Sequence, residues 1–202
     1  TAHKTWVFDP STRSRSFSEN PRFHDPEIFT EQFYKPAGAL LGSKLSGFIF
    51  EHEYQRAATC PPPEANIESH DAFFSRIPED SRYHIEERTD RLKSPDYFRF
   101  LRERKIGNVF SHWSYLPPLD RQLEQAGGFS NRQAVIIRLL PPRGMKYEDA
   151  YLRYFPFAEL KDEDPKMFDD TAALAKKAIE EEVDAWVTVN NRAGGNAPQI
   201  AR

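Results

Sequence analysis

The feature that most constrains the fold is a regular alternation of short apolar runs with segments of helical periodicity, which continues from residue 44 onward. Five runs indicate strands, because apolar and polar residues alternate along them. They are KLSGFIFE (44–51), SRYHIEER (81–88), IGNVFSH (106–112), QAVIIRLL (133–140) and AWVTVNN (185–191). Strands that alternate with helices form parallel sheets, so the pattern predicts an α/β fold.

Helices are expected between these strands. The predicted ranges are 63–76, a helix opened by Ser94 and Pro95, 116–126, 147–155 and 170–183. Ser94 is a favourable N-cap, Pro95 fits the first helical position, and Gly127 with Gly128 ends the helix before them. In the first forty residues, 25–41 is expected to be a helix, 5–8 is a candidate sixth strand, and 11–20 is expected to be an exposed polar loop.

Length and composition narrow the class of protein. The chain has 202 residues, which fits a single domain, and 39% hydrophobic residues suffice for a core. The net charge of −3 gives no sign of strong attraction to nucleic acid or to an anionic membrane. No apolar run approaches the roughly 18 residues of a membrane helix. The single cysteine, Cys60, excludes an internal disulfide, and with the absence of a signal-like stretch it favours a cytoplasmic protein.

Side-chain alternation separates an apolar face of each strand from a polar one. In a parallel barrel the polar face points into the lumen, where it would gather charged and amide side chains near the carboxyl-terminal strand ends. These residues are Glu51, Glu86, Arg88, His112, Arg138 and Asn190. Active sites of such barrels occupy that end. Buried charges must be paired or face a wet pocket, so the group forms either a structural salt-bridge network, such as Glu86 with Arg138, or a ligand site.

Several stretches resemble the YecE-like family, also described as domain of unknown function 72. They are NPRFHDPEIF (20–29), LGSKLSGFIFE (41–51), RYHIEER (82–88), SHWSYLP (111–117), IIRLLPPRGMKYEDA (136–150) and VNNRAGGNAP (189–198). The last is the most specific, because two asparagines that end a strand before a Gly-Gly-Asn-Ala-Pro turn are unusual. The resemblance implies a TIM-type (β/α)8 barrel that covers residues 1–202 as a single domain.

The resemblance also implies that parts of the barrel are missing. The family's opening strand, with a Gly-Thr-Ser-Gly-Trp motif, and its second strand, with Glu-Ile-Asn and Thr-Phe-Tyr motifs, have no counterpart, and the sequence stops as the family's last helix begins. We therefore expect an incomplete barrel, truncated at both ends, whose open sheet edges favour oligomers. The family often has glutamine at the position of Glu51, and it has no agreed activity, so the resemblance implies the fold and leaves the function open.

The first functional hypothesis is a pocket for a small anionic or phosphorylated ligand. Barrels often bind phosphate in the loops after strands seven and eight, at a helix N-terminus. The corresponding loops contain Arg143 in one and Asn191, Arg192, Gly194 and Gly195 in the other. Both place arginine beside glycine, which allows a close approach of the backbone beside a fixed cation. The alternative is that the glycines form only a tight turn and the arginines are solvated.

The second hypothesis is an enzyme of unknown cofactor requirement. Glu86 would act as acid or base, Arg88 and Arg138 would orient an anionic substrate, and Asn190 and Asn191 would donate hydrogen bonds to it.

A metal-dependent version, a hydrolase or nuclease-like barrel acting on phosphate esters, would use Glu51, Glu86 and His112 to hold zinc or manganese, although nearby arginines oppose a cation. A third hypothesis is a non-enzymatic binding or structural protein in which Trp113 and Tyr115 stack on a base or sugar. His52, His70 and His84 are individually uninformative.

Overall fold

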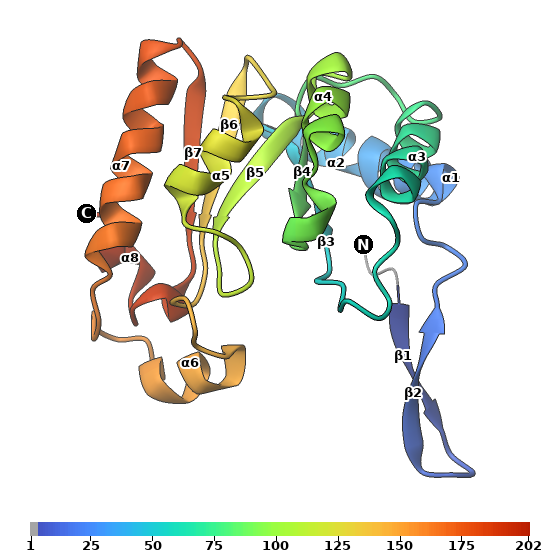
Figure 1. Ribbon diagram of the computed structural model, residues 1–202, viewed down its shortest axis with the longest axis horizontal. Coiled ribbons are helices and arrows are strands. Elements are labelled where there is room, and N and C mark those ends of the chain that lie inside the picture. Colours follow the sequence, from blue (N-terminus) through green and yellow to red (C-terminus); the bar gives the residue numbers. More distant parts are fainter. Residues whose placement is uncertain (1–3) are drawn as a thin grey trace.

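The computed structural model describes residues 4–202, and its centre is a parallel sheet of five strands in the order β3-β4-β5-β6-β7 (Figure 1). The strands are β3 (Phe48–His52), β4 (Tyr83–Glu87), β5 (Gly107–His112), β6 (Ala134–Leu139) and β7 (Asp184–Val189). Neighbours in the sheet are also neighbours in the sequence, so the predicted α/β fold is confirmed. The sheet is open, with β3 and β7 at its edges, and a closed barrel is not confirmed.

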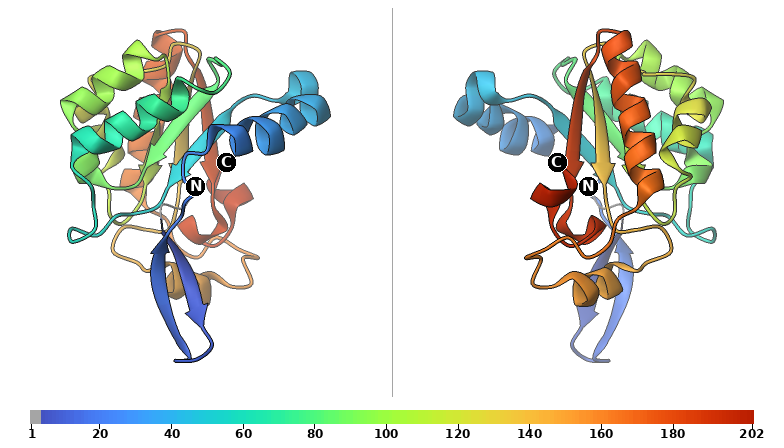
Figure 2. Two further views of the ribbon diagram at one scale, coloured as in Figure 1. Left: turned by 90° about the vertical axis from the view of Figure 1, so that its right-hand side faces the viewer. Right: turned by 90° about the vertical axis from the view of Figure 1, so that its left-hand side faces the viewer.

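Helices cover one face of this sheet (Figures 1 and 2). They are α3 (Pro63–Phe74), α4 (Pro95–Glu103), α5 (Leu119–Ala126) and α7 (Pro165–Glu180). The expected caps are present: the Ser94 hydroxyl accepts a hydrogen bond from the Tyr97 N–H at 3.2 Å, and Gly127 is left-handed. The helix α7 begins before the predicted residue 170, because Asp164 caps it by accepting from the Met167 N–H at 3.0 Å.

Two short helices follow the last two strands of the sheet. They are α6 (Tyr147–Tyr154), after β6, and α8 (Ala197–Ile200), after β7. Figure 1 shows both near the ends at which β6 and β7 terminate. Within residues 4–202, no helix combines the length and the apolar character that crossing a bilayer demands.

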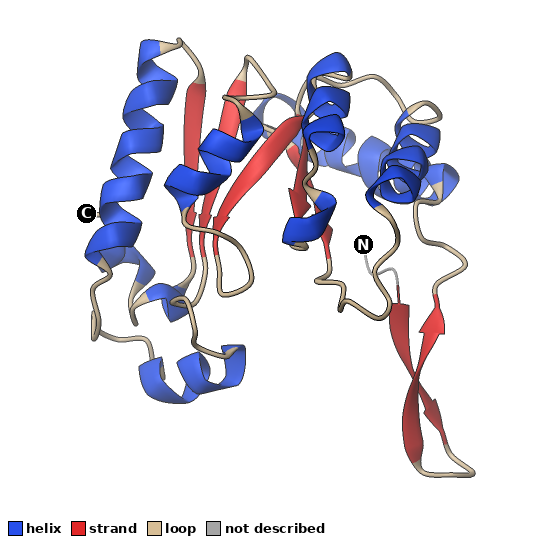
Figure 3. Cartoon of the chain, in the orientation of Figure 1, coloured by secondary structure: helices blue, strands red, loops and turns tan. Residues whose placement is uncertain are grey.

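The N-terminal part forms a hairpin apart from the main sheet (Figure 3). The strand β1 (Lys4–Asp9) pairs antiparallel with β2 (Ser14–Glu19). The candidate strand at 5–8 is therefore a strand, but the expected loop at 11–20 is wrong, since most of it is β2. Its serine- and arginine-rich sequence lacks an apolar face, and backbone pairing with β1 forms the strand without one.

The predicted helix at 25–41 is confirmed as one helical stretch with an irregular centre. It consists of α1 (Pro26–Phe29), a π-helical segment (Thr30–Tyr34) and α2 (Lys35–Leu41). Pro36 has no N–H to donate, and a widened turn just before a proline accommodates the loss. Figure 2 shows this stretch reaching away from the sheet on the side opposite α3 and α4.

The core lies between the sheet and its covering helices, on the predicted face of β3, β4 and β6; β5 differs, because Phe110 packs in the core and His112 shares its face. Its strand residues include Phe48, Phe50, Tyr83, Ile85, Phe110, Val135, Ile137 and Leu139, all of which are buried. The opposite face is more exposed at the two edges of the sheet: Ile49 on β3 keeps 39% of its surface and Trp186 on β7 keeps 47%. That opposite face carries the charged residues of the candidate site.

Candidate functional site at the carboxyl-terminal edge of the sheet

Four charged side chains meet at the carboxyl-terminal end of the sheet, on the face without covering helices. Arg88 forms an ion pair with Glu51 at 2.9 Å and donates to Glu86 at 3.3 Å, while Arg138 donates to Glu51 at 2.8 Å and to Glu86 as well. The sheet register explains the meeting, because Glu51 on β3 lies beside Glu86 on β4. The structure therefore brings together four of the six residues predicted for this face.

The fifth member of this network is Ser111, which the sequence analysis did not name. Ser111 on β5 lies beside Arg138 on β6 in the register, and its hydroxyl donates to the Glu86 carboxylate at 2.6 Å. Ser111 has no exposed surface, and neither has Glu86. The buried carboxylate is thus held by a hydroxyl and two guanidinium groups, as a buried charge requires.

The two carboxylates of the network differ in their access to water. The Glu86 side chain is fully buried, whereas the Glu51 side chain keeps 45% of its surface. Partial burial raises the pKa of Glu51, but the hydrogen bond from Arg138 and the charges of both arginines outweigh it and hold the pKa below its usual value. Two carboxylates thus face two guanidinium groups, so acidic and basic side chains are equal in number in the network.

Aromatic side chains lie beside this network, on the loops that follow β3 and β5. Tyr54 and Tyr115 stack with ring centroids 4.5 Å apart, and Trp113 lies 4.8 Å from Tyr115. The Arg88 guanidinium lies 5.4 Å from the centroid of the Trp113 ring. Tyr115 is 54% exposed, so the cluster offers a flat apolar surface next to the arginines. Trp113 and Tyr115 were candidates from the sequence for stacking on a ligand, whereas Tyr54 was not.

His112 lies on the opposite face of the sheet, so the prediction that it joins Glu51 and Glu86 is wrong. Phe110 packs in the core, and His112, two residues later, must share its face. The His112 Nε2 atom lies 3.3 Å from Asp164, at the start of α7. Burial lowers the pKa of His112 although Asp164 partly opposes this. The proposed metal set of Glu51, Glu86 and His112 is therefore not assembled.

Arg192, predicted to bind an anion, lies among aromatic rings. Its guanidinium lies 4.1 Å from the centroid of the Tyr147 ring, 5.3 Å from that of Tyr151 and 5.6 Å from that of Phe157. These are cation–π distances, and they hold the loop after β7 against α6. Arg143, its predicted partner in the other loop, is exposed.

In the loop after β7, the glycines pack against another segment of the chain, and the asparagine side chains accept hydrogen bonds from backbone N–H groups. A Cβ atom on Gly194 would come within 2.5 Å of the Asp162 carbonyl, and one on Gly195 equally close to that of Glu159. The glycines thus allow the loop to approach the segment at 159–162. Asn190 accepts from the Arg192 N–H, and Asn191 accepts from the Ala197 N–H. The structure does not bring any of these residues into the charged network.

Comparison with known proteins adds a family and a fold. A family model described as "Protein of unknown function DUF72" matches residues 7–202. Among solved structures, the chain resembles a DUF72 family protein from Enterococcus faecalis V583 with a TM-score of 0.55 and 17% sequence identity, over 88% of this chain and 63% of that one. This chain thus spans less than two thirds of its structural relative, and at such identity the likeness concerns the fold alone. No curated protein matches.

Proposed function

The chain belongs to the DUF72 family of proteins of unknown function, and on that premise we propose that it binds a small anionic ligand at the carboxyl-terminal edge of its sheet. The observation that carries the proposal is the sharing of two guanidinium groups, Arg88 and Arg138, between a buried and a half-exposed carboxylate. Ligands of parallel α/β sheets bind at this edge, where the strands end.

Charge balance explains how such a network accepts an anion. Glu86 is held in place by burial and by the Ser111 hydroxyl, so it stays in contact with Arg138. Glu51 is an exposed partner, and exposed ion pairs contribute at most about 1 kcal/mol. If Glu51 turns into solvent, Arg88 and Arg138 are left with one excess positive charge and a free bidentate surface, which suits a phosphate or a carboxylate.

The neighbouring rings favour a ligand that carries a planar group beside its anionic group. Tyr54 and Tyr115 are both partly exposed and already stacked on each other. Stacking of a base on aromatic side chains contributes about 1–3 kcal/mol per base. A mononucleotide combines both features and is the most informative probe. The arginines would repel a metal ion from this place, which disfavours a metal-dependent hydrolase here.

Thermal unfolding of the chain with inorganic phosphate, sulfate or a mononucleotide tests the proposal. A ligand at 100 times its Kd stabilises the folded state by about 2.7 kcal/mol, which is readily measured as a rise in Tm. We expect the mononucleotide to raise Tm, Arg138→Ala to abolish the rise, and Arg99→Ala, which removes an exposed arginine of α4, to preserve it.

Glu51→Gln distinguishes a ligand site from a purely structural network. If Glu51 competes with the ligand for the arginines, its neutralisation strengthens anion binding. If the four charges serve only to fill the sheet face, Glu51→Gln changes stability slightly and no anion raises Tm in either protein. The latter result would refute the proposal and leave a structural role for the network.

A further inference from the structure

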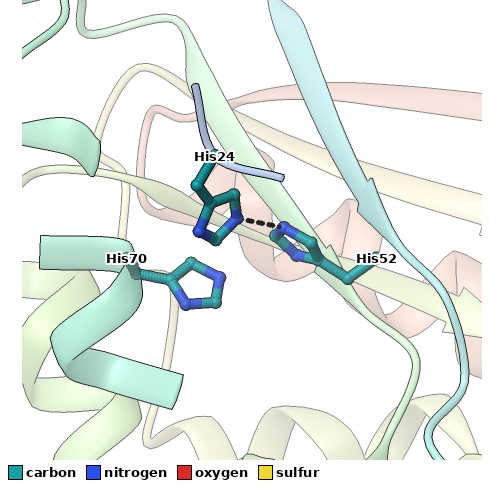
Figure 4. Close-up of side chains that lie close together, drawn as sticks. All are labelled: His24, His52 and His70. Carbon is teal, nitrogen blue, oxygen red and sulfur yellow. Dashed lines mark hydrogen bonds between the residues drawn. The ribbon is translucent and has the colours of Figure 1, made fainter. Parts of the chain in front are cut away.

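We propose that His24, His52 and His70 form a binding site for a divalent transition metal ion, with Zn²⁺ as the favoured ion (Figure 4). One ring nitrogen of each histidine lies within 4.8 Å of those of the other two. They are the sole group of three or more potential metal ligands found in the part of the chain that the structure describes.

Three separate parts of the fold bring the histidines together. His24 precedes α1, His52 ends β3 and His70 lies on α3. The Nε2 atoms of His24 and His52 are 2.9 Å apart, and Figure 4 shows the ring of His70 directed at this pair. The grouping is therefore a product of tertiary packing and has no motif in the sequence.

Hydrogen bonds orient two of the rings in the manner of metal ligands. The Nδ1 atom of His70 lies 2.6 Å from the Asn66 carbonyl oxygen one turn earlier in α3, so Nδ1 carries the proton and Nε2 presents a lone pair. The Nδ1 atom of His24 lies 2.9 Å from the Ser69 hydroxyl, which leaves its Nε2 directed at His52. Metal-binding histidines almost always use their second nitrogen in this way.

Two buried nitrogens of the trio lack partners among the residues described. They are Nε2 of His70 and Nδ1 of His52. A buried polar atom without a hydrogen bond costs about 1–3 kcal/mol, so native proteins rarely retain one without a reason. A metal ion among the rings would take the lone pair of His70 as a ligand and remove that cost.

Two of the three rings, those of His52 and His70, are buried. Burial lowers the pKa of His70 to about 4 despite the hydrogen bond to Asn66, and burial with the charges of His70 and His24 lowers that of His52 well below the usual value. Metal ligation requires the neutral imidazole, and burial shields the rings of His52 and His70 from solvent.

The spacing of the nitrogens fits a small ion after a slight adjustment. Tetrahedral zinc with bonds of about 2.0–2.1 Å holds its ligands roughly 3.3 Å apart. The distance of 2.9 Å between His24 and His52 is below this value, and the limit of 4.8 Å is above it. The rings must therefore shift slightly to place all three nitrogens around one ion.

A three-histidine set leaves a fourth coordination position, and one of the three, His52, also lines a cavity. The cavity has a volume of about 130 Å³, and its lining includes His52, Ser69 and Glu87. That volume holds several water molecules. Zinc sites with three protein ligands and an open position are typical of sites that bind water or substrate on the metal.

The metal site is distinct from the anion site of the preceding section. His52 follows Glu51 directly in β3, and alternation puts their side chains on opposite faces of the sheet. His52 is buried on the helix-covered face, whereas Glu51 is exposed on the other. Either site can therefore fail its test without the other.

A purely structural role is the competing explanation, because the His24 ring is stacked between Phe23 at 3.8 Å and Phe73 at 5.0 Å. Metal binding by the full chain separates the two. After treatment with a chelator, the protein is titrated with Zn²⁺ and with Co²⁺, and affinity, stoichiometry, the visible spectrum of Co²⁺ and Tm are measured. We expect one ion per chain, a four-coordinate Co²⁺ spectrum and a higher Tm with Zn²⁺.

Variants assign the ion to the three histidines. His24→Asn removes a ligand while retaining a residue that tolerates the left-handed conformation at this position, where φ is +54°. We expect His24→Asn and His70→Gln each to weaken Zn²⁺ binding by more than about 100-fold, and Ser69→Ala, which loses only the supporting hydroxyl, by about tenfold. His112→Asn and Arg138→Ala should bind Zn²⁺ as the wild type does.

The proposal is overturned if the wild type binds Zn²⁺ no more tightly than His24→Asn does, or if His112→Asn weakens binding as much as His24→Asn. Circular dichroism of each metal-free variant establishes that it is folded. If His70→Gln does not fold, His24→Asn decides the question, since its side chain lies in a connection outside the helices and strands.

Discussion

Glu86 and Glu51 contact the same two arginines, yet their contributions to stability should differ. Removing one partner of a buried ion pair costs about 3–5 kcal/mol, whereas an exposed pair contributes about 0–1 kcal/mol. Glu86 is fully buried and Glu51 is 45% exposed. We therefore expect Glu86→Gln to lower the free energy of unfolding by several kcal/mol and Glu51→Gln by less than about 1 kcal/mol, measured by urea unfolding. Equal losses would contradict this assignment of burial.

Asp162 gives the clearest pH dependence. Its carboxylate accepts from Arg153 at 2.5 and 2.8 Å and from the Tyr154 hydroxyl at 2.8 Å, and these bonds lower its pKa to about 2. A pKa lowered by folding stabilises the protein above the unfolded value of about 3.9, and the contribution disappears as the pH falls towards 2.

Asp162→Asn should therefore reduce stability by a constant amount above about pH 5. The difference between variant and wild type should shrink through pH 4 to 2, as measured by urea unfolding at each pH. Asp149→Asn, at an exposed carboxylate of α6, serves as the control. A difference that persists unchanged at pH 2 would mean that Asp162 contributes through shape and not through charge.

Single residues were predictable where strand alternation decides their position. The pairing of Glu86 with Arg138 follows from their strand faces. His112 was misplaced because its strand has polar residues on both faces, and Phe110 was the signal for the core side. Tyr54 lies outside any predicted element. The three histidines come from a loop, a strand and a helix, so only the tertiary structure reveals that they meet.

At the scale of elements, the sequence predicted what local chemistry determines. Apolar alternation located all the strands of the main sheet, and Ser94 with Pro95 located the start of α4. The sequence failed where backbone pairing or a distant cap dominates. The strand β2 has no apolar face to reveal it, and Asp164 extends α7 by one turn and a half beyond its apolar pattern. The glycines of the loop after β7, expected either to approach a ligand or to form a tight turn, approach the segment at 159–162.

At the scale of the whole molecule, the open sheet leaves apolar surface exposed. On β7, Trp186 and Val187 keep 47% and 42% of their surface, and Ile49 on β3 keeps 39%. Edge strands with unpaired backbone groups promote association. We predict concentration-dependent self-association of this chain by sedimentation velocity, weakened by Trp186→Lys. Ile179→Lys, at a residue 76% exposed on α7, should have no effect. A chain that remains monomeric at all concentrations would contradict this.

The fold was predictable to the level of a parallel α/β sheet and the family. The TIM-type barrel, expected to be incomplete, was inferred from the resemblance, because each strand's pattern reports only its own two faces and does not specify a barrel. Charged side chains gather on the sheet face without covering helices, as the alternation predicted. The sheet itself is open, with β3 and β7 at its edges. Whether a sheet closes into a barrel depends on which strands pair with one another, and no single strand's sequence specifies this.

The alternation along β3 has a consequence for how this sequence can vary. Glu51 serves one face and His52 the other, so substitutions at either position can alter one site and spare its neighbour. Insertion or deletion of one residue within the strand would exchange the two faces and disable both at once. Related chains should therefore tolerate exchanges of residues in this strand far better than changes in its length.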